Sequence, residues 1–258
     1  MSSSGMTSGM RRPVFIANWK MNNGPTAARA FIAGFTARWT PRDDRTIIFC
    51  PPSICLTTVV HALGSRQDLA AGAQNIWTED KGAFTGETSA PMVKDAGARY
   101  VLVGHSERRH IFGETDEQTG LKCAAAARSG LTPILCVGEL LAEREKGITH
   151  DVVLRQLAAG LAHVTSEVVC SMAIAYEPVW AIGTGKTATA SDAAQVHAVV
   201  REALDGRVGA HAELIPVLYG GSVNTANAKS LLSEDGVDGL LVGGACLDIE
   251  GWATICST

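Results

Sequence analysis

Several residue classes are scarce in this chain of 258 residues, and each shortage excludes a class of protein. Lysine and arginine total 22 against 26 aspartates and glutamates, so the net charge is -4 and no basic stripe is available for nucleic-acid phosphates. No apolar run approaches the length of a membrane span. Charged residues make up 19% and hydrophobic residues 46%, which is enough to bury a large core. The composition predicts a folded protein with a small ligand and with neither nucleic acid nor membrane as a partner.

Cysteines at metal-binding spacing are also missing. The seven cysteines form no CxxC pair, and no histidine lies at zinc-ligand spacing from them. Most are therefore expected to be reduced core residues, and no metal site is expected. The cysteines are Cys50, Cys55, Cys123, Cys136, Cys170, Cys246 and Cys256.

The amino-terminal residues differ in composition from the rest of the chain. Residues 1–9 are rich in Ser, Gly and Thr and lack the charged and apolar regions of a secretory signal. We expect a disordered extension over residues 1–9, followed by one domain over residues 10–258, because no linker divides the remainder. A cytoplasmic enzyme fits these features best.

Short apolar segments alternate with segments of helical spacing along the whole chain. The expected strands lie near residues 14–17, 46–49, 69–73, 100–103, 133–137, 172–176, 215–219 and 239–242. Strands that are apolar on both faces and separated by helices favour a closed parallel sheet over an open, doubly wound one. We therefore predict an α/β fold, a single-domain (β/α)8 barrel of the TIM-barrel type.

Polar residues follow these strands directly, and Glu177 is the most informative of them. It ends an apolar strand, and a loop of small residues lies directly behind it, as expected of a carboxylate base covered by a closing lid. A single acid at a strand end is equally compatible with a solvated position, so partners are needed. Asn18 and Lys20 follow the first strand, and His105 follows the fourth. Since the carboxyl ends of parallel strands meet at one rim, these residues are expected to share a site.

Several segments in fixed order resemble triosephosphate isomerases over nearly the whole chain. They are Ala17–Asn22, Ala73–Asn75, Gly82–Glu87, Gly104–Arg109, Tyr176–Lys186, Tyr219–Val223 and Leu241–Gly244. The resemblance implies proton transfer between adjacent carbons of a small phosphorylated sugar through an enediolate, without metal or organic cofactor. Gly183–Thr187 also imitates the tail of a phosphate-binding P-loop, but Trp180 stands where that motif requires glycine, so this interpretation is excluded.

The resemblance assigns catalytic roles to five residues. Glu177 is implied as the base, and burial in a dry pocket is expected to raise its pKa. His105 is implied as the electrophile, and a helix starting at Ser106 is expected to lower its pKa and keep it neutral. Lys20 is implied to supply positive charge, with Asn18 as a neighbouring donor. Glu107 is either a further site residue or an acid paired with Lys20 or Arg108.

The resemblance also predicts a phosphate site and an apolar clamp. Gly183, Ser222, Gly243 and Gly244, together with Asn18 and Lys20, are expected to bind the substrate and its phosphate, because glycine lets backbone N–H groups approach an anion closely. Ile182 and Leu241 are interpreted either as a clamp that dries Glu177 or as ordinary core residues.

The polar segment from Gln74 to Glu87 is longer than a typical connection and is expected to project into a second subunit. By resemblance Thr85 at its tip would reach the Asn18 region of a partner, which predicts a homodimer. Two alternatives to a triose-phosphate isomerase stay open on the sequence: a related isomerase of a four-carbon ketose phosphate such as an erythrulose phosphate, and a non-catalytic sugar-phosphate-binding barrel.

Overall fold

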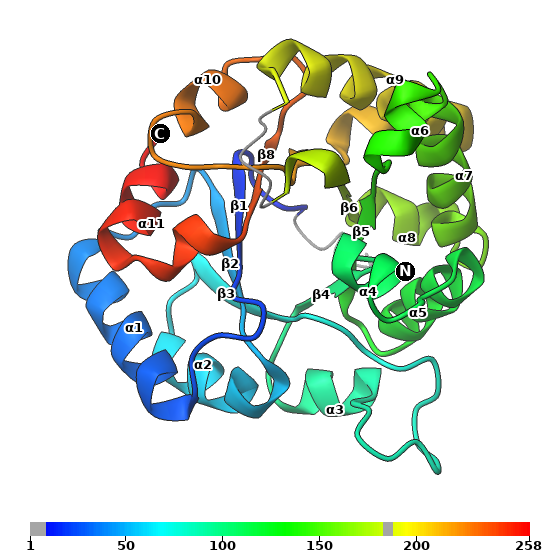
Figure 1. Cartoon of the computed structure of the whole chain (residues 1–258). Coiled ribbons are helices and arrows are strands. Elements are labelled where there is room, and N and C mark those ends of the chain that lie inside the picture. Colours follow the sequence, from blue (N-terminus) through cyan, green and yellow to red (C-terminus); the bar gives the residue numbers. More distant parts are fainter. Residues whose placement is uncertain (1–8, 183–187) are drawn as a thin grey trace, which may run out of the picture.

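The computed structural model describes residues 9–182 and 188–258, and within them eight parallel strands close into a barrel in chain order (Figure 1). β1 pairs with β2 and with β8, so that Val14 lies opposite both Thr46 and Gly239 and the sheet has no free edge. The strands are β1 (Val14–Asn18), β2 (Thr46–Cys50), β3 (Leu69–Ala73), β4 (Tyr100–Val103), β5 (Thr132–Val137), β6 (Ala173–Tyr176), β7 (Val217–Tyr219) and β8 (Gly239–Val242).

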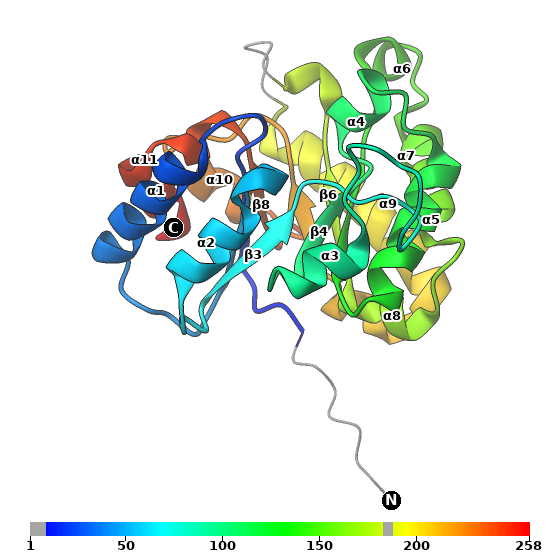
Figure 2. The same cartoon turned by 90° about the horizontal axis from the view of Figure 1, so that it is seen from below.

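Helices surround the barrel on all sides, as the two perpendicular views show (Figures 1 and 2). The α-helices are α1 (Pro25–Arg38), α2 (Leu56–Leu63), α3 (Ala90–Asp95), α4 (Ser106–His110), α5 (Asp116–Arg128), α6 (Leu141–Glu145), α7 (Thr149–Leu161), α8 (Ser166–Ser171), α9 (Ala190–Val208), α10 (Ala228–Leu232) and α11 (Ile249–Cys256). Short 3-10 helices are η1 (Ser53–Cys55), η2 (Val179–Ala181), η3 (Gly209–Leu214) and η4 (Gly244–Leu247). The predicted single-domain (β/α)8 barrel is confirmed.

Two layers of core explain why the strands are apolar on both faces. Alternate strand residues such as Val14 and Ile16 fill the barrel interior, and the residues between them, such as Phe15 and Ala17, pack against the helices. All seven cysteines are free, and six of them are buried. Burial raises the pKa of Cys246 to about 12, which keeps this side chain a neutral thiol.

The seventh strand is shorter than the sequence indicates. The expected strand covered residues 215–219, but β7 begins at Val217. Pro216 has no backbone N–H and cannot donate to a strand ladder, and Ile215 closes the preceding 3-10 turn.

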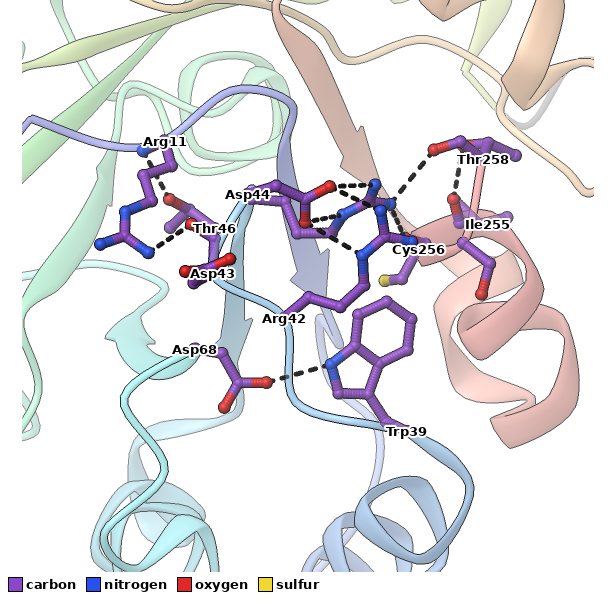
Figure 3. Close-up of polar contacts among 12 residues, drawn as sticks. Arg11, Trp39, Arg42, Asp43, Asp44, Thr46, Asp68, Ile255, Cys256 and Thr258 are labelled. Carbon is purple, nitrogen blue, oxygen red and sulfur yellow. Dashed lines mark hydrogen bonds and ion pairs between the residues drawn. The ribbon is translucent and has the colours of Figure 1, made fainter.

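A network of arginines and aspartates covers the barrel rim at the amino ends of the strands (Figure 3). The Asp44 carboxylate accepts hydrogen bonds from both Arg42 and Arg45. Arg45 is buried and also donates to the main-chain oxygens of Cys256 at 2.5 Å and Thr258 at 3.2 Å. The same side chain therefore ties the start of β2 to the end of α11.

Candidate active site

A cavity of about 250 Å³ opens at the carboxyl ends of the strands, opposite the arginine network. Most of the predicted site residues line it together. They are Asn18, Lys20, His105, Glu177, Ile182, Ser222, Leu241, Gly243 and Gly244. Glu107 reaches the same site through its contact with Lys20, and the predicted phosphate ligand Gly183 lies outside the described residues, as do 184–187 of the expected lid.

Glu177 follows β6 directly and is almost completely buried. Its Oε2 accepts a hydrogen bond from the backbone N–H of Ser106 at 2.9 Å, and its Oε1 lies 2.9 Å from Nε2 of His105. Gly220 leaves room for this side chain, because a Cβ at that position would lie 2.9 Å from the Glu177 Cγ. Burial alone would raise the pKa of Glu177, but the His105 ring and the Ser106 N–H outweigh it and lower the pKa. The expectation of a raised pKa is therefore wrong for this arrangement.

His105 follows β4 and caps the amino terminus of α4. Its Nδ1 accepts a hydrogen bond from the backbone N–H of Glu107 at 3.2 Å, which leaves the proton of the neutral ring on Nε2. That Nε2–H points at the Glu177 carboxylate. Burial lowers the pKa of His105, but the adjacent Glu177 carboxylate outweighs burial and raises it. The expected lowering by the helix terminus is therefore overturned while Glu177 faces the ring.

Lys20 is held at the end of β1 in an unusual backbone conformation. Its φ is 51°, in the left-handed region that residues with side chains rarely adopt. The backbone N–H of Lys20 donates to Oδ1 of Asn18 at 3.0 Å, so the Asn18 amide nitrogen is the group left to face the cavity. The Lys20 ammonium lies 2.7 Å from Oε1 of Glu107. Of the two interpretations of Glu107, the structure supports the acid paired with Lys20.

A second wall of the cavity is built from the turns after β7 and β8. Ser222, Gly243 and Gly244 lie there, and the Asn227 amide donates to the backbone oxygen of Ser222 at 2.9 Å. A Cβ on Gly243 would lie 3.6 Å from the Lys20 ammonium, so this glycine backbone and the cation border the same space. The arrangement places positive charge beside a glycine-rich wall, as an anionic ligand requires.

Two residues at strand ends were not singled out by the sequence argument. Glu139, just beyond β5, is fully buried and accepts hydrogen bonds from Trp180 Nε1 at 2.8 Å and Tyr176 Oη at 3.1 Å, which fixes the chain on both sides of Glu177. Gln74, just beyond β3, donates to the backbone oxygens of Lys20 and Cys50. The strand-end rule that found Glu177 would have found both.

Neither a metal-binding cluster nor a membrane-spanning helix occurs within the described ranges. Residues 9–182 and 188–258 contain no group of three or more His, Cys, Asp or Glu side chains arranged to hold a metal ion. In the same part of the chain no helix is both long and apolar enough to span a membrane.

Comparison with known proteins agrees with this geometry. The sequence profile of the family described as Triosephosphate isomerase matches residues 13–258. The chain is 47% identical over 247 residues to a triosephosphate isomerase from Moorella thermoacetica, and the aligned region covers 95% of this chain and 98% of the relative. It is 47% identical over 253 residues to the protein of the same name from Symbiobacterium thermophilum, and here the aligned region covers 96% of this chain and 97% of the relative. Since both the family profile and these relatives span nearly the full length, the chain belongs to the triosephosphate isomerase family.

Proposed function

We propose that this chain interconverts dihydroxyacetone phosphate and D-glyceraldehyde 3-phosphate, a step of glycolysis and gluconeogenesis. The observation that carries the proposal is the meeting of a buried carboxylate and an imidazole, 2.9 Å apart, in one cavity with the Lys20 ammonium. The names of the similar proteins support the same reaction. We assign the activity to residues 10–258 and no role to residues 1–9. We place the protein in the cytoplasm, where this pathway operates.

Glu177 acts as the base in this proposal. Its lowered pKa keeps the carboxylate ionised in the free enzyme, ready to remove a proton from C1 of the ketose. The electron pair left on C1 forms the enediolate double bond, and negative charge develops on the oxygen at C2. The hydroxyl proton on the C1 oxygen then passes to the C2 oxygen, Glu177 returns its proton to C2, and the aldehyde forms at C1.

The other polar residues stabilise this charge. His105 Nε2–H donates to the carbonyl oxygen and then to the enediolate, while the Glu107 N–H holds Nδ1 as an acceptor. Lys20 supplies a fixed cation, and Asn18 a neighbouring donor. We assign Glu107 to the orientation of Lys20 rather than to proton transfer, because its carboxylate is engaged by that ammonium.

Substrate binding is assigned to the glycine-rich wall and the apolar residues around Glu177. Ser222, Gly243, Gly244 and Gly183 are proposed to donate backbone N–H groups to the phosphate. Ile182 and Leu241 line the cavity beside Glu177, which favours the clamp that excludes water over simple core packing. The reaction moves only protons, so the proposal includes neither a metal nor an organic cofactor.

The proposal is tested by steady-state kcat/KM with both triose phosphates and with D-erythrulose 4-phosphate, for the native chain and for Glu177→Gln. We expect turnover of the triose phosphates that falls roughly 10²- to 10⁴-fold in the variant, since a general base is lost. A strong preference for the tetrulose phosphate would transfer the function to the four-carbon substrate. Binding without exchange of the C1 hydrogen with deuterated solvent would identify a non-catalytic barrel.

We further propose that the working form is a homodimer formed through loop 74–87. This loop projects beyond the ring of helices (Figure 1), and Thr85 at its tip is exposed. A groove of about 470 Å³ lies beside the base of the loop, between α2 and α3, with Ile54 and Met92 in its lining. Since both residues are largely exposed in the single chain, a second copy of the loop would cover apolar surface there.

A further inference from the structure

The backbone of Lys20 needs more support than a regular strand end. Its φ of 51° is in the left-handed region, which is unfavourable for residues other than glycine. Such a conformation persists only where neighbouring groups hold it. A change at this backbone would move the ammonium that faces the cavity. The groups that bind the Lys20 main chain therefore decide where its charge lies.

Two side chains bind the two polar groups of the Lys20 main chain. Asn18 Oδ1 accepts from the Lys20 N–H at 3.0 Å, and Gln74 Nε2 donates to the Lys20 carbonyl at 2.9 Å. The same Gln74 nitrogen donates to the Cys50 carbonyl at 2.9 Å, and that carbonyl also accepts from the N–H of Trp19 at 3.1 Å. One amide from the end of β3 thus joins the ends of β1 and β2.

We propose that Gln74 is a positioning residue for the reaction, which holds the Lys20 main chain so that the ammonium lies at the anionic substrate. The required chemistry is specific, because two carbonyl oxygens converge on one side-chain nitrogen and only a group with two N–H donors satisfies both. At its other end Lys20 is held by Glu107 at 2.7 Å, so backbone and side chain are fixed independently. This inference rests on the proposed role of Lys20.

Two substitutions of Gln74 separate hydrogen bonding from packing. Gln74→Met keeps the length of the side chain and removes both donors, and we expect kcat/KM to fall about tenfold or more because small displacements of charged groups are costly. Gln74→Glu keeps the shape but replaces the donor by a carboxyl group. When protonated this group donates to one carbonyl, and when ionised it repels both. At pH 7.5 an ordinary carboxyl group is ionised, so kcat/KM of Gln74→Glu is expected to fall at least as far as that of Gln74→Met.

Controls distinguish this effect from changes in charge, folding or assembly. Gln67→Glu introduces the same charge at an exposed glutamine that donates to the Ser65 carbonyl, and its kcat/KM is expected to match the native value. Gln74 also lines the groove assigned to the second copy, so sedimentation of each variant is compared with that of the native chain. Lys20→Met tests whether Gln74 acts through Lys20. Inhibition by inorganic phosphate measures how well each variant binds an anion at this position. The double variant Lys20→Met/Gln74→Met is expected to bind phosphate as weakly as Lys20→Met alone.

The outcomes separate this inference from the proposed function. Absence of isomerase activity in the native chain, or full activity in Lys20→Met, refutes the proposed function and the inference with it. If native and Lys20→Met behave as expected, native-like kcat/KM in Gln74→Met or in Gln74→Glu overturns the inference alone. Loss of the fold in both Gln74 variants also overturns it, because Gln74 would then support the whole barrel.

Discussion

At the scale of single residues, burial alone does not decide how an ionisable group behaves in this protein. Glu177 and His197 are both almost fully buried, and burial opposes the charged form of each. The His105 ring and the backbone N–H of Ser106 both stabilise the Glu177 carboxylate, so its charged form prevails. His197 donates from Nδ1 to the Gly236 carbonyl at 2.8 Å, and its Nε2 has no hydrogen-bond partner within the described residues. Its neutral form prevails.

The coupling between His105 and Glu177 predicts a shift that NMR can measure. In the native chain the Glu177 carboxylate raises the pKa of His105 against the effect of burial. Glu177→Gln removes that carboxylate, so the pKa of His105 is expected to fall, and a ¹³C titration of the imidazole checks this. Glu107→Gln is the matched control, because the Glu107 carboxylate lies 3.7 Å from Nδ1 and is more exposed. A larger fall in the control would contradict the proposed pairing.

His197 predicts a loss of stability in acid. Burial lowers its pKa to about 4, whereas an unfolded histidine titrates near 6.5. Between these values the unfolded chain binds a proton that the folded chain does not, so the contribution to the free energy of unfolding is complete above pH 6.5 and lost as pH falls toward 4. The difference of about 2.5 pH units corresponds to about 3 kcal/mol.

Urea unfolding at pH 7.5 and 4.5 measures this contribution. We expect the native chain to lose roughly 2–3 kcal/mol more on acidification than His197→Gln, which cannot gain a proton there. Other titrating groups are common to both chains and cancel in the comparison. Equal losses would show that His197 does not control acid stability.

At the scale of elements, the sequence allowed the barrel to be predicted because each strand is buried on both faces and therefore reads as an apolar run. The same rule located Glu177, which follows β6 directly, and His105, which follows β4 after one glycine. The pKa directions were missed because they depend on a contact between the ends of β4 and β6 that local spacing does not encode. The role of Gln74 was not predicted because it depends on contacts with the ends of β1 and β2, which local spacing does not encode.

The link between β2 and α11 predicts an effect on stability alone. Arg45→Met leaves the carbonyls of Cys256 and Thr258 without their buried donor, and we expect the free energy of unfolding to fall by about 2–3 kcal/mol. Arg42→Met is the matched control, because Arg42 also binds Asp44 but is exposed and, within the described residues, donates no hydrogen bond to α11. Its cost is expected to stay below about 1 kcal/mol.

Isomerase kinetics complete this test. Both arginine variants alter the amino-terminal rim, so kcat/KM of the folded protein is expected to match the native value. A fall in kcat/KM for Arg45→Met at full folding would show that the two rims are coupled.

At the scale of the whole molecule, the proposed homodimer makes assembly and activity interdependent. Lys20 and Asn18 lie at the end of β1, and the proposed dimer would bring Thr85 of a second copy to this region. Met21, next to Lys20, is 96% exposed in the single chain. A partner loop seated there would cover an apolar side chain directly beside the proposed cation and restrict the segment that carries it.

Thr85→Arg tests this arrangement by placing a long charged side chain at the loop tip. The native chain is expected to sediment at twice 27.0 kDa, and the variant to shift toward 27.0 kDa with specific activity that declines on dilution. Ala162→Arg, at an exposed residue outside both loop and groove, controls for the added charge and is expected to remain dimeric. A native chain that sediments at 27.0 kDa with full activity would refute the dimer, because the site would then be complete within one copy.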